Sequence, residues 1–138
     1  MCVGPGRNAM DEGEFLVSIK LPLKNSSFSA SYERFIPRNE MDIAVAAVAS
    51  SVSLENGKIS SCRIALAAVG PTPIFAEEAS ELLIGKEPSE ENIKNASNKA
   101  KELASPISDM RGTVEHRKDL IEVLTRRTLS KAVERVGV

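Results

Sequence analysis

Four charged side chains crowd the short span from residue 34 to residue 42, namely Arg34, Arg38, Glu40 and Asp42. Binding residues are often carried by loops that rigid neighbours hold in place, and the following residues have the composition of a buried strand. An exposed loop whose charges pair locally, for example Arg38 with Asp42, explains the same residues equally well. The residues by themselves leave both interpretations open.

No other group of residues indicates catalysis. His116 is the only histidine, and its place near the start of a predicted helix favours a surface or capping role over that of a base. A metal site would need carboxylates alone, such as Glu77, Glu78 and Glu81, which we expect to form a solvated acidic helix face. No serine lies in a G-x-S-x-G motif. We therefore expect no catalytic residue and no metal site.

Two further short segments have structural explanations. Gly4-Pro5-Gly6-Arg7 resembles a phosphate cradle, but proline removes one N–H donor and a strand follows where a helix would be required. We interpret it as a linker turn. Asp109 and Arg111 lie in a loop between two predicted helices, and we expect a structural ion pair there.

The composition narrows the class of protein. With 138 residues, 42% hydrophobic and 27% charged, the chain is long enough for one globular domain. A net charge of −1 argues against nonspecific binding to nucleic acid or to a membrane surface. No apolar run could span a bilayer and the N-terminus lacks a signal-peptide pattern, so we expect a cytoplasmic protein. Cys2 and Cys62 form no C-x-x-C motif, which excludes a zinc or iron–sulfur site built from this chain alone.

The first half of the sequence predicts strands. Apolar residues alternate from Phe15 to Leu21, and Pro22 ends that strand. A polar turn over 24–31 and a short extended piece over 32–36 follow. Residues 42–54 and 58–69 form a predicted hairpin, because Asn56-Gly57 is the typical sequence of a type I′ turn.

The second half of the sequence predicts helices. One begins at Thr72-Pro73-Ile74 and runs to about residue 84, where Gly85 is its C-cap. Ser89 caps a second, which ends at Ser105-Pro106, and Thr113 caps the last. The fold class is therefore α+β, an antiparallel sheet of three or more strands with about three helices on one face.

Several segments, taken in order, resemble one known family. They are Gly4-Pro5, Glu14-Phe15-Leu16 up to Pro22, Tyr32-Glu33-Arg34-Phe35, Arg38 to Ala44, Val69-Gly70-Pro71-Thr72-Pro73 and Ser105-Pro106-Ile107-Ser108-Asp109-Met110-Arg111-Gly112. Each is unspecific alone, but together they cover nearly the whole chain. The chain thus resembles the C-terminal domain of the FAD-binding (medium) subunit of molybdenum hydroxylases, the xanthine dehydrogenase and aerobic carbon monoxide dehydrogenase family.

The resemblance implies how FAD would be shared. In that family an N-terminal domain with glycine-rich loops holds most of the cofactor, and this chain, a single domain over 1–138, has no such loops. The resemblance implies two flavin contacts from the C-terminal domain. They are Leu16, an apolar contact, and Arg34, where the family usually has lysine. It also implies that residues 35–42, with Arg38 and Asp42, form a loop that controls acceptor access. We expect weak or absent FAD binding by the isolated chain.

The resemblance also implies a function. The chain would complete the flavin site and a subunit interface in a complex that passes electrons from iron–sulfur clusters to FAD, without turnover of its own. Its partners would be a FAD-binding domain or chain, an iron–sulfur subunit and a molybdenum subunit. The alternative is a stand-alone interaction or small-ligand-binding domain that keeps the fold and has no redox role.

Overall fold

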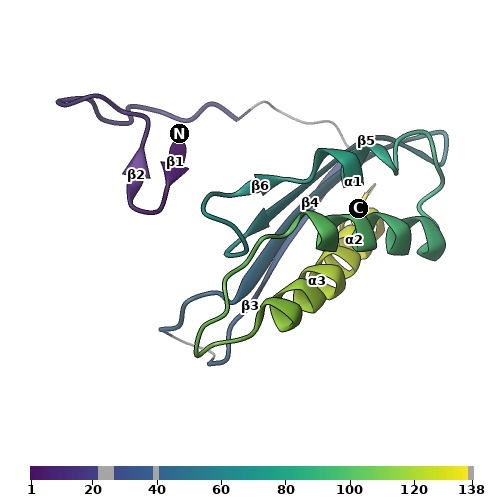
Figure 1. Ribbon diagram of the computed structural model, residues 1–138. Helices are drawn as coiled ribbons and strands as arrows, with labels where there is room; N and C mark the ends of the chain where they lie inside the picture. Colours follow the sequence, from purple (N-terminus) through teal and green to yellow (C-terminus); the bar gives the residue numbers. More distant parts are fainter. Residues whose placement is uncertain (22–26, 39–40, 137–138) are drawn as a thin grey trace.

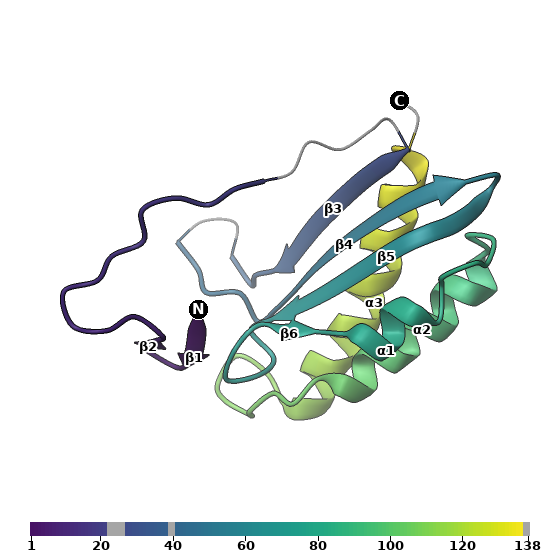
Figure 2. The same ribbon diagram turned by 90° about the horizontal axis from the view of Figure 1, so that it is seen from above.

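The computed structural model describes residues 1–21, 27–38 and 41–136. A four-stranded antiparallel sheet with strand order β3-β4-β5-β6 is covered on one face by three helices (Figures 1 and 2). Its elements are β3 (Phe28–Phe35), β4 (Ala46–Glu55), β5 (Lys58–Ala67), β6 (Ile74–Phe75), α1 (Glu77–Glu81), α2 (Glu90–Leu103) and α3 (Val114–Glu134). The predicted α+β fold is confirmed. Within the described ranges no helix has both the length and the apolar composition needed to cross a membrane.

The β4–β5 hairpin forms the centre of the sheet, as the sequence predicts. Asn56 and Gly57 have φ values of 52° and 76°, which a type I′ turn requires at its two central positions. Antiparallel pairing then places Val48 opposite Leu66 and Val52 opposite Cys62. All four side chains are buried, because alternate residues of both strands face the helices.

The two long helices begin where the sequence places their caps. The Ser89 hydroxyl accepts a hydrogen bond from the N–H of Asn92 at 3.3 Å, and the Thr113 hydroxyl accepts one from His116 at 3.2 Å. Each satisfies a donor that has no partner inside its helix. Because Ser105-Pro106 ends α2, a short loop over 104–113 connects the two helices.

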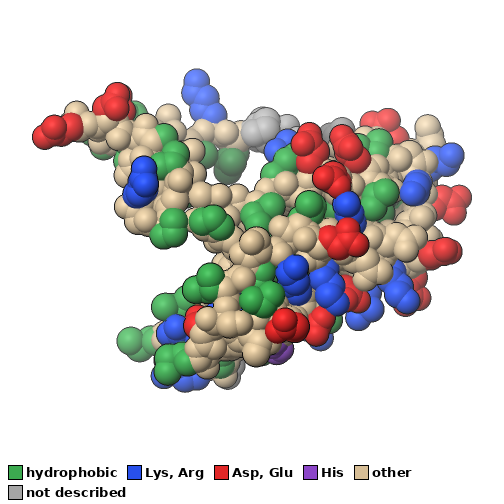
Figure 3. Space-filling view, viewed as in Figure 1, with side chains coloured by type: hydrophobic (Ala, Val, Ile, Leu, Met, Phe, Trp, Pro, Cys, Tyr) green, Lys and Arg blue, Asp and Glu red, His purple; other side chains and the backbone are tan. Residues whose placement is uncertain are grey.

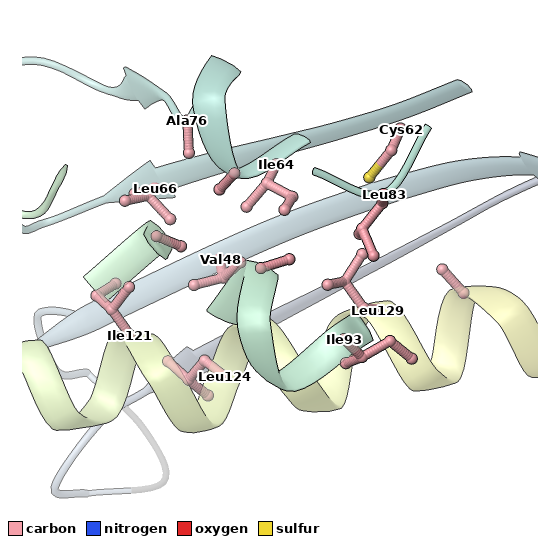
Figure 4. Packing of buried hydrophobic residues seen from close by; sticks show 14 of the residues in the cluster. Val48, Cys62, Ile64, Leu66, Ala76, Leu83, Ile93, Ile121, Leu124 and Leu129 are labelled. Atoms are coloured by element: carbon pink, nitrogen blue, oxygen red, sulfur yellow. The ribbon is translucent and has the colours of Figure 1, made fainter. Parts of the chain in front are cut away.

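One continuous core lies between the sheet and the helices (Figure 4). Val48, Ile64 and Leu66 from the strands meet Ile121 and Leu129 from α3, and all five are fully buried. Such burial is the main favourable contribution to folding. The face of the sheet away from α3 carries mostly small residues and no helix (Figure 2).

Residues 76–86 cover the outer edge of β5. Ser80 Oγ accepts a hydrogen bond from Ile64 N–H at 3.0 Å, and Ala76 N–H donates to the Ile64 carbonyl at 2.9 Å. Gly85 and Lys86 pair in the same way with the backbone of Ile59. An edge strand whose polar groups are paired offers no template for a further strand.

The predicted helix from residue 72 to about residue 84 is wrong in extent. Residues 74–75 form strand β6, and only Glu77–Glu81 are α-helical. Pro71 and Pro73 hold the chain extended, so Ile74 pairs with Leu66 before the chain can turn into a helix. Gly85 has a φ of 77°, as a capping glycine should, but it lies four residues after the helix.

The strand predictions before residue 36 also need correction. Residues 15–21 form no strand, since the described residues offer them no neighbouring chain with which to pair. Of the turn predicted for 24–31, residues 24–26 lie outside the described residues, as does Pro22, and β3 begins at Phe28. The turn predicted at Gly4-Pro5-Gly6-Arg7 connects the strands of a small hairpin, β1 (Cys2–Gly4) and β2 (Arg7–Asn8).

Candidate functional site

The candidate site lies at the end of the sheet where β3 finishes and β4 begins. Residues 43–44, 68–71 and the loop over 104–113 lie around Pro5 in the turn of the β1–β2 hairpin there. They enclose a hollow of about 450 Å³ whose lining includes Pro5, Ile43, Gly70, Pro106 and Asp109. Figure 3 shows the surface notched at this end, between the N-terminal segment and the loops. Segments far apart in sequence therefore meet around one opening.

Arg34 lies near the end of β3 and is not part of the lining of this hollow. It pairs in register with Ala47, and its side chain is exposed. Strand alternation places it with Ala30 and Tyr32 on the face of the sheet that no helix covers. Its guanidinium has no hydrogen bond or ion pair with any residue that the structure describes. The charge is thus open to an anionic group approaching that face.

The Arg38–Asp42 pair closes the loop between β3 and β4. Asp42 accepts hydrogen bonds from the N–H of Arg38 at 3.1 Å and of Ile43 at 2.9 Å, and Arg38 Nε lies 3.5 Å from Asp42 Oδ2. Partial desolvation opposes ionisation of Asp42, but these N–H donors and the guanidinium outweigh it and lower the pKa of the carboxyl. The local Arg38–Asp42 pairing, one of the two interpretations that the sequence left open, is present, while Glu40 lies outside the described residues.

Arg117 fastens the loops to the sheet, a role that the sequence reasoning missed. Its side chain is 6% exposed and donates to the carbonyls of Val45 at 2.9 Å and Ala68 at 3.3 Å. Its Nη2 lies 2.7 Å from Asp109 Oδ1, and this contact lowers the pKa of the Asp109 carboxyl. Arg117 falls four residues before Ile121 on the apolar stripe of α3, and this position could have predicted that its side chain is buried.

The expected pairing of Asp109 with Arg111 is therefore wrong in its partner. Arg111 contributes its backbone N–H, which donates to Asp109 Oδ1 at 2.8 Å, while the partly buried ion pair is made by Arg117. The Arg117 guanidinium also donates to the buried carbonyl of Val45 and to the carbonyl of Ala68.

His116 makes a packing contact with an aromatic ring. Its ring meets the edge of Phe35 with centroids 6.0 Å apart and planes 83° apart, which packs α3 against the end of β3. Across the described ranges no cluster of His, Cys, Asp and Glu could hold a metal ion. Cys2 is exposed, and burial raises the pKa of the Cys62 thiol to about 12, so that thiol is inert at neutral pH.

Leu16 lies away from Arg34 in this structure. It helps to line a separate hollow of about 620 Å³ between the N-terminal hairpin and residues 13–18, together with Met1 and Met10. None of five hollows found on the described surface is lined by both Leu16 and Arg34. That the two residues touch one cofactor stays a prediction.

Comparison with known proteins places this arrangement in context. The sequence-family model described as "CO dehydrogenase flavoprotein C-terminal domain" matches residues 31–132 of this chain. The carbon monoxide dehydrogenase medium chain of Afipia carboxidovorans is 32% identical over 127 residues, which are 92% of this chain and 44% of that protein. A putative xanthine dehydrogenase FAD-binding subunit of Escherichia coli is 27% identical over 97% of this chain and 46% of its own length.

Solved structures agree with the sequence relatives. The carbon monoxide dehydrogenase of Hydrogenophaga pseudoflava superposes with a TM-score of 0.92 at 28% identity, covering 97% of this chain and 46% of that one. Quinoline 2-oxidoreductase of Pseudomonas putida gives a TM-score of 0.90 at 27% identity, covering 99% and 47%. The chain spans about half the length of the curated relatives that it matches.

Proposed function

Because the chain belongs to the family of CO dehydrogenase flavoprotein C-terminal domains, we propose that it forms one wall of a shared flavin site. The cradle for the FAD diphosphate lies in a further domain or chain. The whole chain acts as one domain of a molybdenum hydroxylase FAD-binding subunit in the cytoplasm. FAD bound there supplies the electron-transfer chemistry, and this chain alone has no turnover.

The residues present fit a wall and not a cradle. A diphosphate needs converging N–H groups, typically at a helix N-terminus, whereas Gly4-Pro5-Gly6-Arg7 only turns β1 into β2. A flavin ring needs apolar surface and a cation near its N1–C2=O edge, and the chain offers Leu16 and Arg34 for these. This chemistry is the reason to expect little FAD affinity in the chain by itself.

The observation that carries the proposal is the open charge of Arg34. The guanidinium stands on the exposed strand end and is committed to no partner among the described residues. A cation at the N1–C2=O edge stabilises the negative charge that a flavin ring gains on reduction. Arginine keeps its charge at every relevant pH, so it replaces the usual lysine of the family without loss of that field.

Arg38 and Asp42 then control access to the site. Their pairing holds the β3–β4 loop against the strand ends, directly after Arg34 and Phe35. An electron acceptor approaching the flavin ring would pass this loop. Loosening the pair changes how the acceptor reaches the ring, without changing how the ring is held.

The partners follow from the same proposal. Carbon monoxide and xanthine dehydrogenases of this family pass electrons through an iron–sulfur subunit from a molybdenum subunit, and we propose that the complete flavoprotein docks with both. This chain contributes to those interfaces through surfaces outside its helix-covered face.

Flavin kinetics of an Arg34 variant test the proposal. In the assembled complex we expect Arg34→Ala to slow flavin reduction or reoxidation about tenfold, because the negative charge of the reduced ring loses its counter-charge. Arg34→Lys should restore most of the rate. Arg127→Ala, which removes an exposed charge from α3, is the matched control. Stopped-flow rates in Arg34→Ala equal to those of the parent would remove Arg34 from the site.

A further inference from the structure

The segment Phe15–Leu21 exposes more apolar surface than a free chain would tolerate. Phe15, Val17, Ile19 and Leu21 are 77%, 82%, 73% and 84% exposed. They recur at every second position, while Ser18 and Lys20 fall between them. Alternation of this kind is the pattern of a strand with one face in a core. A contiguous apolar patch of this kind marks an interaction surface.

The backbone of the same segment is also without partners. The nearest preceding backbone hydrogen bond joins Glu14 N–H to the Asp11 carbonyl at 3.1 Å, and residues 15–21 make none with the described part of the chain. Figures 1 and 2 show the segment reaching away from the sheet as an extended trace. Unpaired N–H and C=O groups along an extended chain are a template for strand addition.

The structural comparison indicates what covers the segment. The match to the Hydrogenophaga pseudoflava enzyme covers 97% of this chain, so about four residues fall outside it and at least part of the segment has a counterpart there. The described residues of this chain give the segment no backbone partner. The matched part is 46% of the solved chain, so more than half of it is available to supply such a partner.

We propose that residues 15–21 add as a strand to a sheet edge in the flavin-carrying part of the protein, with Phe15, Val17, Ile19 and Leu21 buried in its core. The inference rests on the proposed function, because it takes the flavin-carrying part as the partner. Main-chain hydrogen bonds supply the pairing, and the four apolar side chains set the register. The segment thereby attaches this chain to the part of the protein that holds the FAD diphosphate.

Hydrogen exchange tests this docking without reference to FAD. In the chain alone, the amides of residues 15–21 should exchange freely. In the complete flavoprotein, whether its parts are one chain or two, they should exchange at least about 100-fold more slowly. Equally fast exchange in both would overturn the inference. Arg34 kinetics are independent of this readout, so failure of the strand and failure of the flavin site are distinguishable.

A pair of lysine variants tests which face is buried. Val17→Lys should weaken assembly of the complete flavoprotein at least about tenfold in a binding titration, since a charge enters the apolar interface. Ser18→Lys adds the same charge to the other face and should leave assembly unchanged. Both variants should melt like the parent chain, because the segment lies outside the core. Equal assembly by the two variants would overturn the assignment.

A second copy of the chain is the competing occupant. Sedimentation of the chain alone should show a monomer at micromolar concentration. A dimer that Val17→Lys dissociates and Ser18→Lys preserves would assign the segment to self-association and overturn the proposal.

Discussion

Asp42 is the residue on which the shape of the β3–β4 loop depends. Its carboxylate is 6% exposed and accepts two backbone hydrogen bonds in addition to its pairing with Arg38. Charge-assisted bonds of this kind are stronger than neutral ones. The Asp42 carboxylate therefore holds Arg38 and Ile43 in place, and their order should depend on the ionisation of that carboxyl.

The pH dependence follows from the direction of that pKa shift. The folded-state pKa of Asp42 lies below 3.8, so its stabilising effect is present above that pH and is lost as the pH falls through the folded-state pKa. Amide exchange at Arg38 and Ile43 should then stay protected between about pH 5 and pH 8. Asp42→Ala should expose both amides at pH 7, because it removes both acceptor oxygens, whereas Asp119→Ala should not. Protection that survives in Asp42→Ala would show that other contacts order these amides.

Arg117 connects α3 to the loops at the end of the sheet where the candidate site lies. Without its guanidinium the carbonyls of Val45 and Ala68 and the Asp109 carboxylate lose a common donor. We expect Arg117→Ala to lower the free energy of unfolding by about 1–3 kcal/mol, because it leaves the buried carbonyl of Val45 without a donor. Urea denaturation measures the loss, and Arg126→Ala on the same helix is the control. A variant as stable as the parent would contradict this role.

Residue types predicted some of these contacts and missed others. Proximity in sequence was enough to suggest the Arg38–Asp42 pair. The Arg117 contacts join residues 45, 68, 109 and 117, and no local pattern contains such separations. Arg34 was assigned through a family resemblance, and its unpaired state became visible only in the structure.

At the scale of elements, the β4–β5 hairpin sets the register of the sheet. Gly57 has a φ of 76°, and nothing lies within 4 Å of a Cβ added there. The cost of Gly57→Val is therefore conformational strain in a β-branched residue, and we expect about 1–2 kcal/mol of destabilisation. Gly57→Asn should lose less, because asparagine tolerates the left-handed region. Equal melting temperatures for Gly57→Val and the parent would contradict the type I′ assignment.

Helices with clear caps and the hairpin with Asn56-Gly57 could be predicted because the signals are local. Residues 15–21 carry a strand pattern that is physically sound, yet the prediction fails in this chain because a strand needs a neighbour. The same pattern becomes consistent if the neighbour belongs to another part of the protein. Strand β6 was missed and the helix containing α1 was predicted too long, because their pairing with β5 is set by tertiary contacts.

At the scale of the whole molecule, the sheet and helices form a packed core, whereas the N-terminal segment exposes its apolar side chains. The sheet and three helices enclose a continuous core. The N-terminal segment and the open face beside Arg34 leave apolar and charged groups without partners among the described residues. We therefore expect the chain to fold by itself but to bind FAD only together with the flavin-carrying part of the protein.

FAD titration tests most directly whether the flavin site is shared between this chain and a further domain or chain. Calorimetric titration of FAD into the chain alone should show no saturable binding at micromolar concentration, because the described residues form no set of converging N–H groups that could hold a diphosphate. The complete flavoprotein should bind FAD, with Arg34→Ala changing the flavin kinetics. Tight, stoichiometric FAD binding by the chain alone would contradict the shared site.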